Sequence, residues 1–244
     1  MDPLYVLKAS VLVNLVNSKQ YPRFLYKYRA FDEHSLDALS NHSLWFSFPD
    51  SFNDPFEGRI RISAEMANSI LEPVGMNSQE GIEQFLSECD EKLINPLRKK
   101  NAVCCLSGVP DQILLWSHYA ESHKGFCLEF DLLSDPDFFW PLLPVQYEKE
   151  FLESDVFNNT NEAIRHLFQR KYVDWDYEKE FRLFRTKEGL FPFKPGALKR
   201  VIFGCRSGEE YKQKIKDILG DSVQYSVCSL DARAFKLNIQ PLTR

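Results

Sequence analysis

The chain has 244 residues, of which 44% are hydrophobic and 14% aromatic, with 20 Phe and 10 Tyr. This length and composition indicate a folded protein with a sizeable core and disfavour a disordered chain. The net charge of −5 disfavours a broad surface for nucleic acid or an anionic membrane, because such surfaces need clustered Lys and Arg.

The cysteines and the apolar runs indicate the compartment. Six cysteines form no CxxC pair, and in Val103-Cys104-Cys105-Leu106 two of them lie beside apolar residues, where a thiol packs as a small hydrophobe. With no secretory segment evident, we expect free thiols in a reducing cytoplasm. No apolar run approaches the length that crosses a bilayer, so we expect a soluble, cytoplasmic protein with no membrane partner.

Apolar spacing near the N-terminus predicts a helix within residues 1–20, which leaves residues 21–244 as a single domain. Aromatic-rich runs and helical spacing then alternate along the first half of the chain. The predicted elements are a strand at 24–31, a helix after Asp32, a strand at 44–48, helices between 62 and 100, and a strand at 102–106.

The segment 49–58 is dense in turn-forming residues. Asn and Asp side chains can bond the nearby backbone, so a rigid loop held by such turns is one interpretation. The other is that Asn53, Asp54 and Glu57 line the mouth of a pocket. The sequence leaves both open.

Polar and aromatic side chains gather at residues 113–131. A short helix at 113–122 is expected to precede a turn at Gly125 and a strand at 126–130 that alternates with period two. Residues at such junctions often line clefts. The binding candidates here are Trp116, His118, Tyr119 and Lys124.

A second polar concentration alternates from Glu178 onward, so Glu178, Glu180 and Arg182 share one face of a predicted strand. These three charges form either a surface ladder or an acidic pair that Arg182 orients in a cleft. The surrounding elements are a strand at 145–147, a helix at 161–171, a strand at 198–204, a helix after Ser207, and strands at 223–227 and 234–239. Without regular βαβ alternation, the order predicts an α+β domain with a mixed, largely antiparallel sheet and peripheral helices.

Four segments resemble the successive motifs of a bacterial family, domain of unknown function 2971 (DUF2971). They are LYKYRAF at 25–31, LWFSFPDSFNDPFEG at 44–58, LLWSHYAESHKGFCLEFD at 114–131 and VDWDYEKEFRLF at 173–184. The resemblance extends from Leu25 to about Gly204. It implies a soluble bacterial protein, and some members of the family are associated with mobile elements or phage defence.

A more distant similarity is to ADP-ribosyltransferases of the diphtheria-toxin and poly-ADP-ribose-polymerase type. Residues 25–28 resemble the first motif of that group, residues 44–47 the second and residues 180–184 the third. Lys27 stands where the group has His, and a charged Lys cannot accept a hydrogen bond. The similarity implies NAD as a substrate and an ADP-ribosyltransferase-like fold.

The same similarity implies roles for individual side chains. Glu180 would be the catalytic carboxylate, Ser47 would position the nicotinamide ribose, and Tyr28 or Tyr119 would stack on the nicotinamide ring. Cleavage of the nicotinamide–ribose bond passes through an oxocarbenium-like state, and the cationic leaving group departs neutral, so no general acid is needed. A carboxylate that stabilises the developing positive charge, from the pair Glu178 and Glu180, can carry much of the work.

The working hypothesis is therefore NAD-dependent ADP-ribosyl transfer or NAD cleavage by a toxin or phage-defence effector, with an unknown protein or nucleic-acid acceptor and no metal. The residues expected to contact NAD or another nucleotide are Tyr26, Lys27, Tyr28, Arg29, Asn53, Asp54, Glu57, Trp116, His118, Tyr119, Lys124 and Arg182.

Two other classes stay open. A metal-dependent nuclease or hydrolase would use carboxylates that suit magnesium or manganese, whereas no HExxH or CxxC pattern supports zinc. Its candidate ligands are Asp54, Glu57, His118, Glu178 and Glu180. A non-enzymatic module of a defence system would instead sense a nucleotide or partner, with Trp116, Tyr119, His123 and Lys124 as recognition groups.

Overall fold

Eight strands form the main sheet of the protein, which a computed structural model describes for residues 2–154, 157 and 159–242. The end positions 1 and 244 of the two expected units lie outside the described residues. The strands are β1 (Phe24–Arg29), β3 (Ala102–Ser107), β4 (Phe126–Asp131), β5 (Leu142–Pro144), β8 (Glu180–Arg185), β10 (Leu198–Phe203), β11 (Gln224–Leu230) and β12 (Leu237–Pro241).

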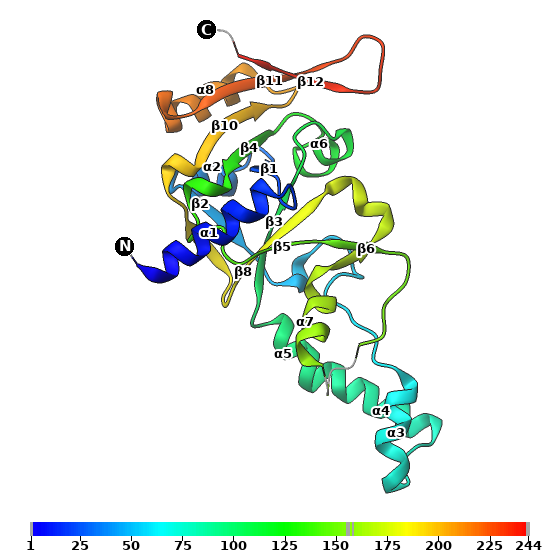
Figure 1. Cartoon of the computed structure of the whole chain (residues 1–244). Helices are drawn as coiled ribbons and strands as arrows, with labels where there is room; N and C mark the ends of the chain where they lie inside the picture. Colours follow the sequence, from blue (N-terminus) through cyan, green and yellow to red (C-terminus); the bar gives the residue numbers. More distant parts are fainter. Residues whose placement is uncertain (1, 155–156, 158, 243–244) are drawn as a thin grey trace.

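The spatial order of these strands is β12-β11-β10-β4-β1-β3-β8-β5 (Figure 1). The β10–β11 pair is parallel and the other neighbouring pairs are antiparallel. The predicted α+β class with a mixed, largely antiparallel sheet is therefore confirmed.

Two small sheets flank the main one. One pairs β2 (Ser43–Phe46) with β9 (Gly189–Pro192), and the other pairs β6 (Gln146–Glu148) with β7 (Arg170–Tyr172). Directly after β2, the backbone of Ser47 exchanges hydrogen bonds of 3.1 and 2.8 Å with Val103 of β3. This bridge connects the end of β2 to β3 in the main sheet.

The helices surround this framework. They are α1 (Pro3–Asn17), α2 (Glu33–Ser40), α3 (Ala64–Leu71), α4 (Gln79–Cys89), α5 (Asn95–Arg98), α6 (Ile113–Tyr119), α7 (Thr160–Gln169) and α8 (Glu209–Leu219). Figure 1 shows α3 and α4 at the end of the molecule opposite α8. Within the described part of the chain, no helix is both long enough and apolar enough to cross a membrane.

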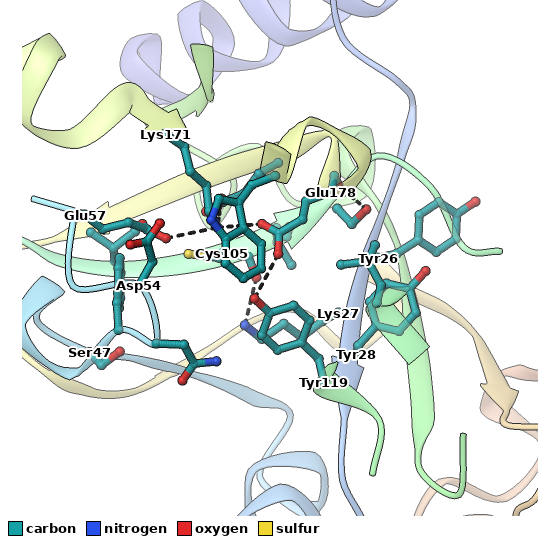
Figure 2. Close-up of a pocket in the computed structure, with 18 of the residues that line it drawn as sticks. Tyr26, Lys27, Tyr28, Ser47, Asp54, Glu57, Cys105, Tyr119, Lys171 and Glu178 are labelled. Carbon is teal, nitrogen blue, oxygen red and sulfur yellow. Dashed lines mark hydrogen bonds and ion pairs between the residues drawn. The ribbon is translucent and has the colours of Figure 1, made fainter. Parts of the chain in front are cut away.

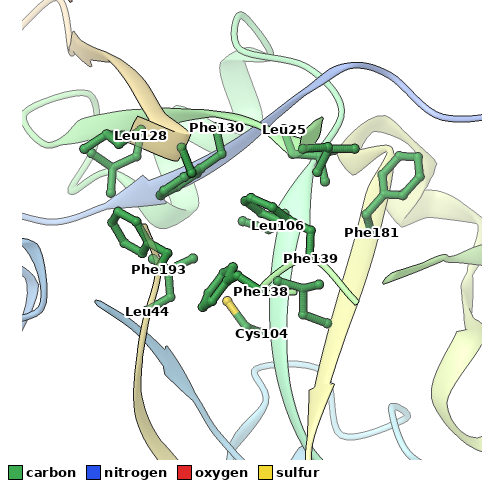
Figure 3. Packing of buried hydrophobic residues seen from close by; sticks show 14 of the residues in the cluster. Leu25, Leu44, Cys104, Leu106, Leu128, Phe130, Phe138, Phe139, Phe181 and Phe193 are labelled. Atoms are coloured by element: carbon green, nitrogen blue, oxygen red, sulfur yellow. The ribbon is translucent and has the colours of Figure 1, made fainter. Parts of the chain in front are cut away.

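The largest hydrophobic core is rich in phenylalanine (Figure 3). Phe130 of β4 packs edge-on against Phe193 with ring centres 5.0 Å apart, and Phe138 packs against Phe139 at 5.1 Å. All four rings are at most 5% exposed. Burying each such side chain contributes about 1.5–3 kcal/mol, so the aromatic composition serves mainly to build this core.

Three boundaries differ from the sequence prediction. The helix expected at 113–122 ends at Tyr119, because Glu121, Ser122 and His123 have φ values of 49°, 53° and 69°, outside the right-handed helical region. The helix expected at 161–171 ends at Gln169, and Lys171 lies in β7.

The third difference concerns Glu178. It was predicted to share a strand face with Glu180, but it lies in the 3₁₀ helix Val173–Glu178, and β8 begins two residues later. Lys179, between the two glutamates, adopts a left-handed φ of 46°. The chain therefore turns sharply between the two carboxylates.

Candidate functional site

A cavity of about 220 Å³ lies beside the central strands of the main sheet, and we refer to it as the first cavity. Its wall combines β1, β3, the start of β8, the loop after β2 and the end of α6. The sequence-predicted residues that line it are Tyr26, Lys27, Tyr28, Arg29, Ser47, Asn53, Asp54, Glu57, Tyr119, Glu178 and Glu180.

Strand register explains why distant segments meet here. Tyr26 of β1 and Glu180 of β8 each pair with Ser107 of the intervening strand β3. Ser107 Oγ donates a 2.6 Å hydrogen bond to the carbonyl oxygen of Glu178, which fixes the turn before β8. Ser47 reaches the same cavity through its bridge to Val103.

Five buried charged side chains form a network at the cavity, which we call the charge cluster: Glu57, Lys171, Glu178, Glu180 and Arg182. Lys171 Nζ lies 2.9 Å from Glu57 Oε1, 2.6 Å from Glu178 Oε2 and 3.2 Å from Glu180 Oε2. Figure 2 shows Lys171 pointing between Glu57 and Glu178. These four side chains are at most 6% exposed, so water screens their charges little.

Arg182 bonds to two carboxylates of the charge cluster, those of Glu57 and Glu180. Its Nε donates to Glu180 Oε1 at 2.7 Å, one terminal nitrogen donates to the carbonyl oxygen of Phe168 at 2.9 Å, and the other donates to Glu57. Its side chain is 2% exposed and does not line the cavity. Arg182 thus holds two of the cluster's carboxylates rather than contacting a ligand.

The cluster separates the pKa values of its two neighbouring glutamates. Burial alone would raise the pKa of Glu180, but Arg182 and Lys171 outweigh it and hold that pKa below its usual range. For Glu178, burial is the largest effect and its pKa is raised, although Lys171 opposes the rise. Pairs of groups whose pKa values are driven apart are typical of acid–base sites.

The two cations are held firmly in the charged form. Burial would lower the pKa of Lys171, but the carboxylates of Glu180, Glu57 and Glu178 outweigh it and raise that pKa. The pKa of Arg182 is likewise raised, because Glu180 and Glu57 outweigh the effect of burial. The cluster thus brings three carboxyl groups against two cations.

Glu178 is less fully bonded than Glu180. Its Oε1 accepts a 2.8 Å hydrogen bond from the hydroxyl of Tyr119, and its Oε2 accepts from Lys171. Glu180 accepts three hydrogen bonds from Arg182 and Lys171 and a further one from the thiol of Cys105. Since a carboxylate has about four lone-pair sites, Glu178 retains acceptor capacity that Glu180 lacks.

The two tyrosines of β1 line the cavity, but their hydroxyls bond to groups outside the charge cluster. Tyr28 packs edge-on against Trp116 at 5.2 Å and donates a 2.7 Å hydrogen bond to the carbonyl oxygen of Val109. Tyr26 donates to Glu129 at 3.0 Å. Of the two tyrosines predicted to stack on a ligand ring, only Tyr119 directs its hydroxyl toward the charge cluster (Figure 2).

Lys27 occupies the position of the expected histidine. Its Nζ donates a 2.8 Å hydrogen bond to the carbonyl oxygen of Cys105 in β3. The ammonium group is thereby anchored at the cavity wall, and as a cation it can only donate. Lys27 can therefore bind an anionic or carbonyl oxygen of a ligand, but it cannot replace the acceptor nitrogen of a neutral His.

Besides Arg182, three predicted contact residues do not reach the first cavity. Trp116 is fully buried, and its indole N–H donates to the carbonyl oxygen of Pro110 at 2.8 Å. His118 is exposed beside the ring of Trp175, and Lys124 is exposed in the turn before β4. These three side chains lie outside the cavity, because α6 turns Tyr119 rather than its neighbours toward the charge cluster.

Sequence reasoning missed several wall residues, among them Lys171, Trp175, Trp45 and Cys105. Lys171 was placed in a helix, and its three-residue strand is too short to give a periodic signal. Trp175 lies within the fourth motif, and its ring covers Lys171 Nζ at 4.8 Å. Burial, followed by the charge of Glu180, raises the pKa of the Cys105 thiol well above its usual range, so the thiol is neutral.

The carboxylates do not form a metal site in this arrangement. Among residues 2–154, 157 and 159–242, no group of three His, Cys, Asp or Glu side chains could hold a metal ion. The carboxylates of Glu57, Glu178 and Glu180 instead converge on the ammonium group of Lys171.

Comparison with known families gives a match to part of the chain. The model of a family described as "Protein of unknown function (DUF2971)" matches residues 115–183. This finding confirms the family resemblance over that segment, which carries Tyr119, Lys171, Glu178 and Glu180; the motifs at 25–31 and 44–58 lie outside it. No curated protein and no solved structure matches the chain.

Proposed function

We propose that the first cavity binds the nicotinamide end of NAD or a related nucleotide and cleaves the bond between nicotinamide and ribose. One observation carries this proposal: the segments 25–28, 44–47 and 180–184, which resemble three successive motifs of ADP-ribosyltransferases, each contribute side chains to one cavity, among them Lys27, Ser47 and Glu180. They come from separate strands and are brought together by sheet register, so their convergence does not follow from sequence proximity.

The charge cluster suits this reaction electrostatically. The nicotinamide–ribose bond breaks with positive charge developing on the ribose, and a fixed negative charge nearby lowers the energy of that state. Glu180 is held ionised by Arg182 and Lys171, and it supplies this charge. Its position is rigid, because every oxygen is already hydrogen-bonded before a ligand arrives.

Glu178 takes the second role in the proposal. Its carboxylate, which has lone pairs left free by Tyr119 and Lys171, accepts a hydrogen bond from a ribose hydroxyl or takes the proton of an attacking water. Its raised pKa favours proton uptake. Ser47 positions the ribose, and Tyr119 and Trp175 supply ring surface for nicotinamide. The cation of Lys27 binds a phosphate or carboxamide oxygen.

A second candidate is a nucleotide-sensing module of a defence system that binds without turnover. The observation that favours it is the complete pairing of Glu180, which leaves that carboxylate no free lone pair for a ribose hydroxyl. The two candidates share the cavity and the ligand class. They differ in whether the bound nucleotide is cleaved.

Incubation of the purified protein with NAD tests the proposal. We expect nicotinamide release that persists in the presence of a chelator, and dependence on added cell lysate would indicate a transferred acceptor. Thermal stabilisation by NAD without release would favour the sensing module. If NAD causes no nicotinamide release and no thermal stabilisation, both candidates are contradicted. Release that a chelator abolishes would favour the metal-dependent hydrolase instead.

A further inference from the structure

A second cavity of about 540 Å³ adjoins the first one, on the other side of Lys171 and Trp175. Both cavities share the wall residues Asn53, Asp54, Glu57, Lys171 and Trp175. The volume of the second cavity falls within the range of about 300–1,000 Å³ that small-molecule sites occupy. A ligand in one cavity can therefore contact side chains that also line the other.

Apolar and aromatic side chains form one part of the wall of the second cavity, beside polar and charged ones: Phe56, Ile60, Phe151, Leu152, Tyr172 and Trp175. Phe56, Phe151 and Tyr172 remain 61%, 44% and 47% exposed. The rings of Phe56 and Phe151 lie 6.3 Å apart, so they form one aromatic wall. Exposed rings around a concave site provide stacking surface for a planar ligand.

The boundary between the cavities carries a carboxylate that the charge cluster does not include. Asp54 is 8% exposed and lines both cavities. Its Oδ1 accepts a 2.8 Å hydrogen bond from the backbone N–H of Phe56, which fixes the carboxylate to the turn that carries the aromatic wall. Figure 2 shows Asp54 beside Glu57 at the wall of the first cavity, and Asp54 also lines the second cavity.

We propose that the second cavity binds the acceptor of the reaction, a small planar aromatic molecule with a hydroxyl or amino nucleophile. This inference rests on the proposed cleavage of NAD in the first cavity. The acceptor oxygen or nitrogen forms a bond to C1′ of the ribose as the C1′–N bond to nicotinamide breaks. The bonding electron pair leaves with nicotinamide, which becomes neutral, and Asp54 takes the acceptor's proton.

The probe for this site is 2-naphthol, whose fluorescence reports binding without any turnover. We expect Phe56→Ser and Phe151→Ser to weaken its binding about tenfold, the effect of losing one aromatic contact. Both side chains are largely exposed, so these variants should fold. Phe235→Ser is the matched control, because this ring on the β11–β12 hairpin is fully exposed and lines neither cavity.

With NAD present, mass spectrometry should detect an ADP-ribosyl conjugate of 2-naphthol, and Phe56→Ser should lower the ratio of conjugate to released nicotinamide. Absent binding, or equal binding to all four proteins, would overturn the second site whatever happens to NAD. Nicotinamide release without conjugate, or with an unchanged ratio in Phe56→Ser, would overturn the acceptor role alone. Probe binding without any nicotinamide release would remove the proposed function and the acceptor role together.

Discussion

The two faces of β8 meet opposite environments. Phe181 and Leu183 point into the phenylalanine-rich core, whereas Glu180 and Arg182 point into the charge cluster. One face is stabilised by excluding water from apolar surface, and the other buries charges that must neutralise one another to be tolerated. β8 therefore contributes one face to the hydrophobic core and the other to the charge cluster.

Replacing Arg182, on the polar face of β8, should cause the largest loss of stability. Arg182→Met keeps much of the side-chain volume but leaves Glu57 and Glu180 short of a buried cation. We expect the free energy of unfolding to fall by about 4 kcal/mol, because an uncompensated buried charge is costly. Urea unfolding measures the change, and a loss below about 1 kcal/mol would show that water reaches the cluster freely.

Truncating Leu183, on the apolar face of β8, should lower the free energy of unfolding somewhat less. Leu183 is fully buried in the main core, so Leu183→Ala removes apolar contacts and leaves a cavity. We expect a loss of about 3 kcal/mol in the same urea assay. An effect larger than that of Arg182→Met would reverse the order of the two faces.

Lowering the pH should remove the stability that Glu180 contributes on the polar face of β8. The pKa of Glu180 is lowered from 4.5 in the folded protein, so its contribution to stability is present above about pH 4.5 and is lost as the pH falls toward the folded value. Thermal unfolding from pH 6 to pH 3 should therefore show a smaller fall in Tm for Glu180→Gln than for the wild type. Equal slopes would contradict the lowered pKa.

Glu178→Gln provides the matched comparison for this pH series. The pKa of Glu178 is raised, so its contribution is present below the unfolded value of 4.5 and is lost as the pH rises through the folded value. The sign is opposite to that of Glu180. Replacement of Glu178 should therefore steepen the loss of Tm in acid, and a shallower loss would show that the assignment of the two glutamates is reversed.

A surface ion pair gives the smallest expected effect. Lys92 and Glu88 lie 2.7 Å apart on a helix, with side chains 67% and 44% exposed. Because solvent and salt screen such a pair, Lys92→Met should change the free energy of unfolding by less than about 0.5 kcal/mol. A loss comparable to that of Arg182→Met would show that burial does not decide the strength of these charges.

Local patterns in the sequence predicted most strands of the fold. Period-two alternation identified β4 and the two faces of β8 from Glu180 onward, and aromatic runs identified β1. The end of α6 could not be read, because three consecutive non-glycine residues adopt left-handed φ values there. Lys171 was misplaced because its strand β7 has three residues and directly follows a helix.

The sequence predicted many of the residues of the candidate site but not how they are arranged in space. Glu57 and Glu180 were both candidates, but their joint contact with Lys171 depends on how remote segments fold together. The burial of Trp116 was not predicted, because it depends on a backbone acceptor for the indole N–H six residues away. Strand order, which inserts β3 between β1 and β8, is not contained in any local pattern.

The most direct test of the central claim compares Glu180→Gln with the wild type in two assays, nicotinamide release from NAD and NAD affinity. Glutamine keeps the shape of the side chain and removes its charge. We expect the rate of release to fall by about 10²–10³-fold while the Kd for NAD changes little, as for a group that acts mainly on the transition state. Equal rates in the two proteins would contradict the role of this carboxylate, and no release from the wild type would contradict the cleavage itself.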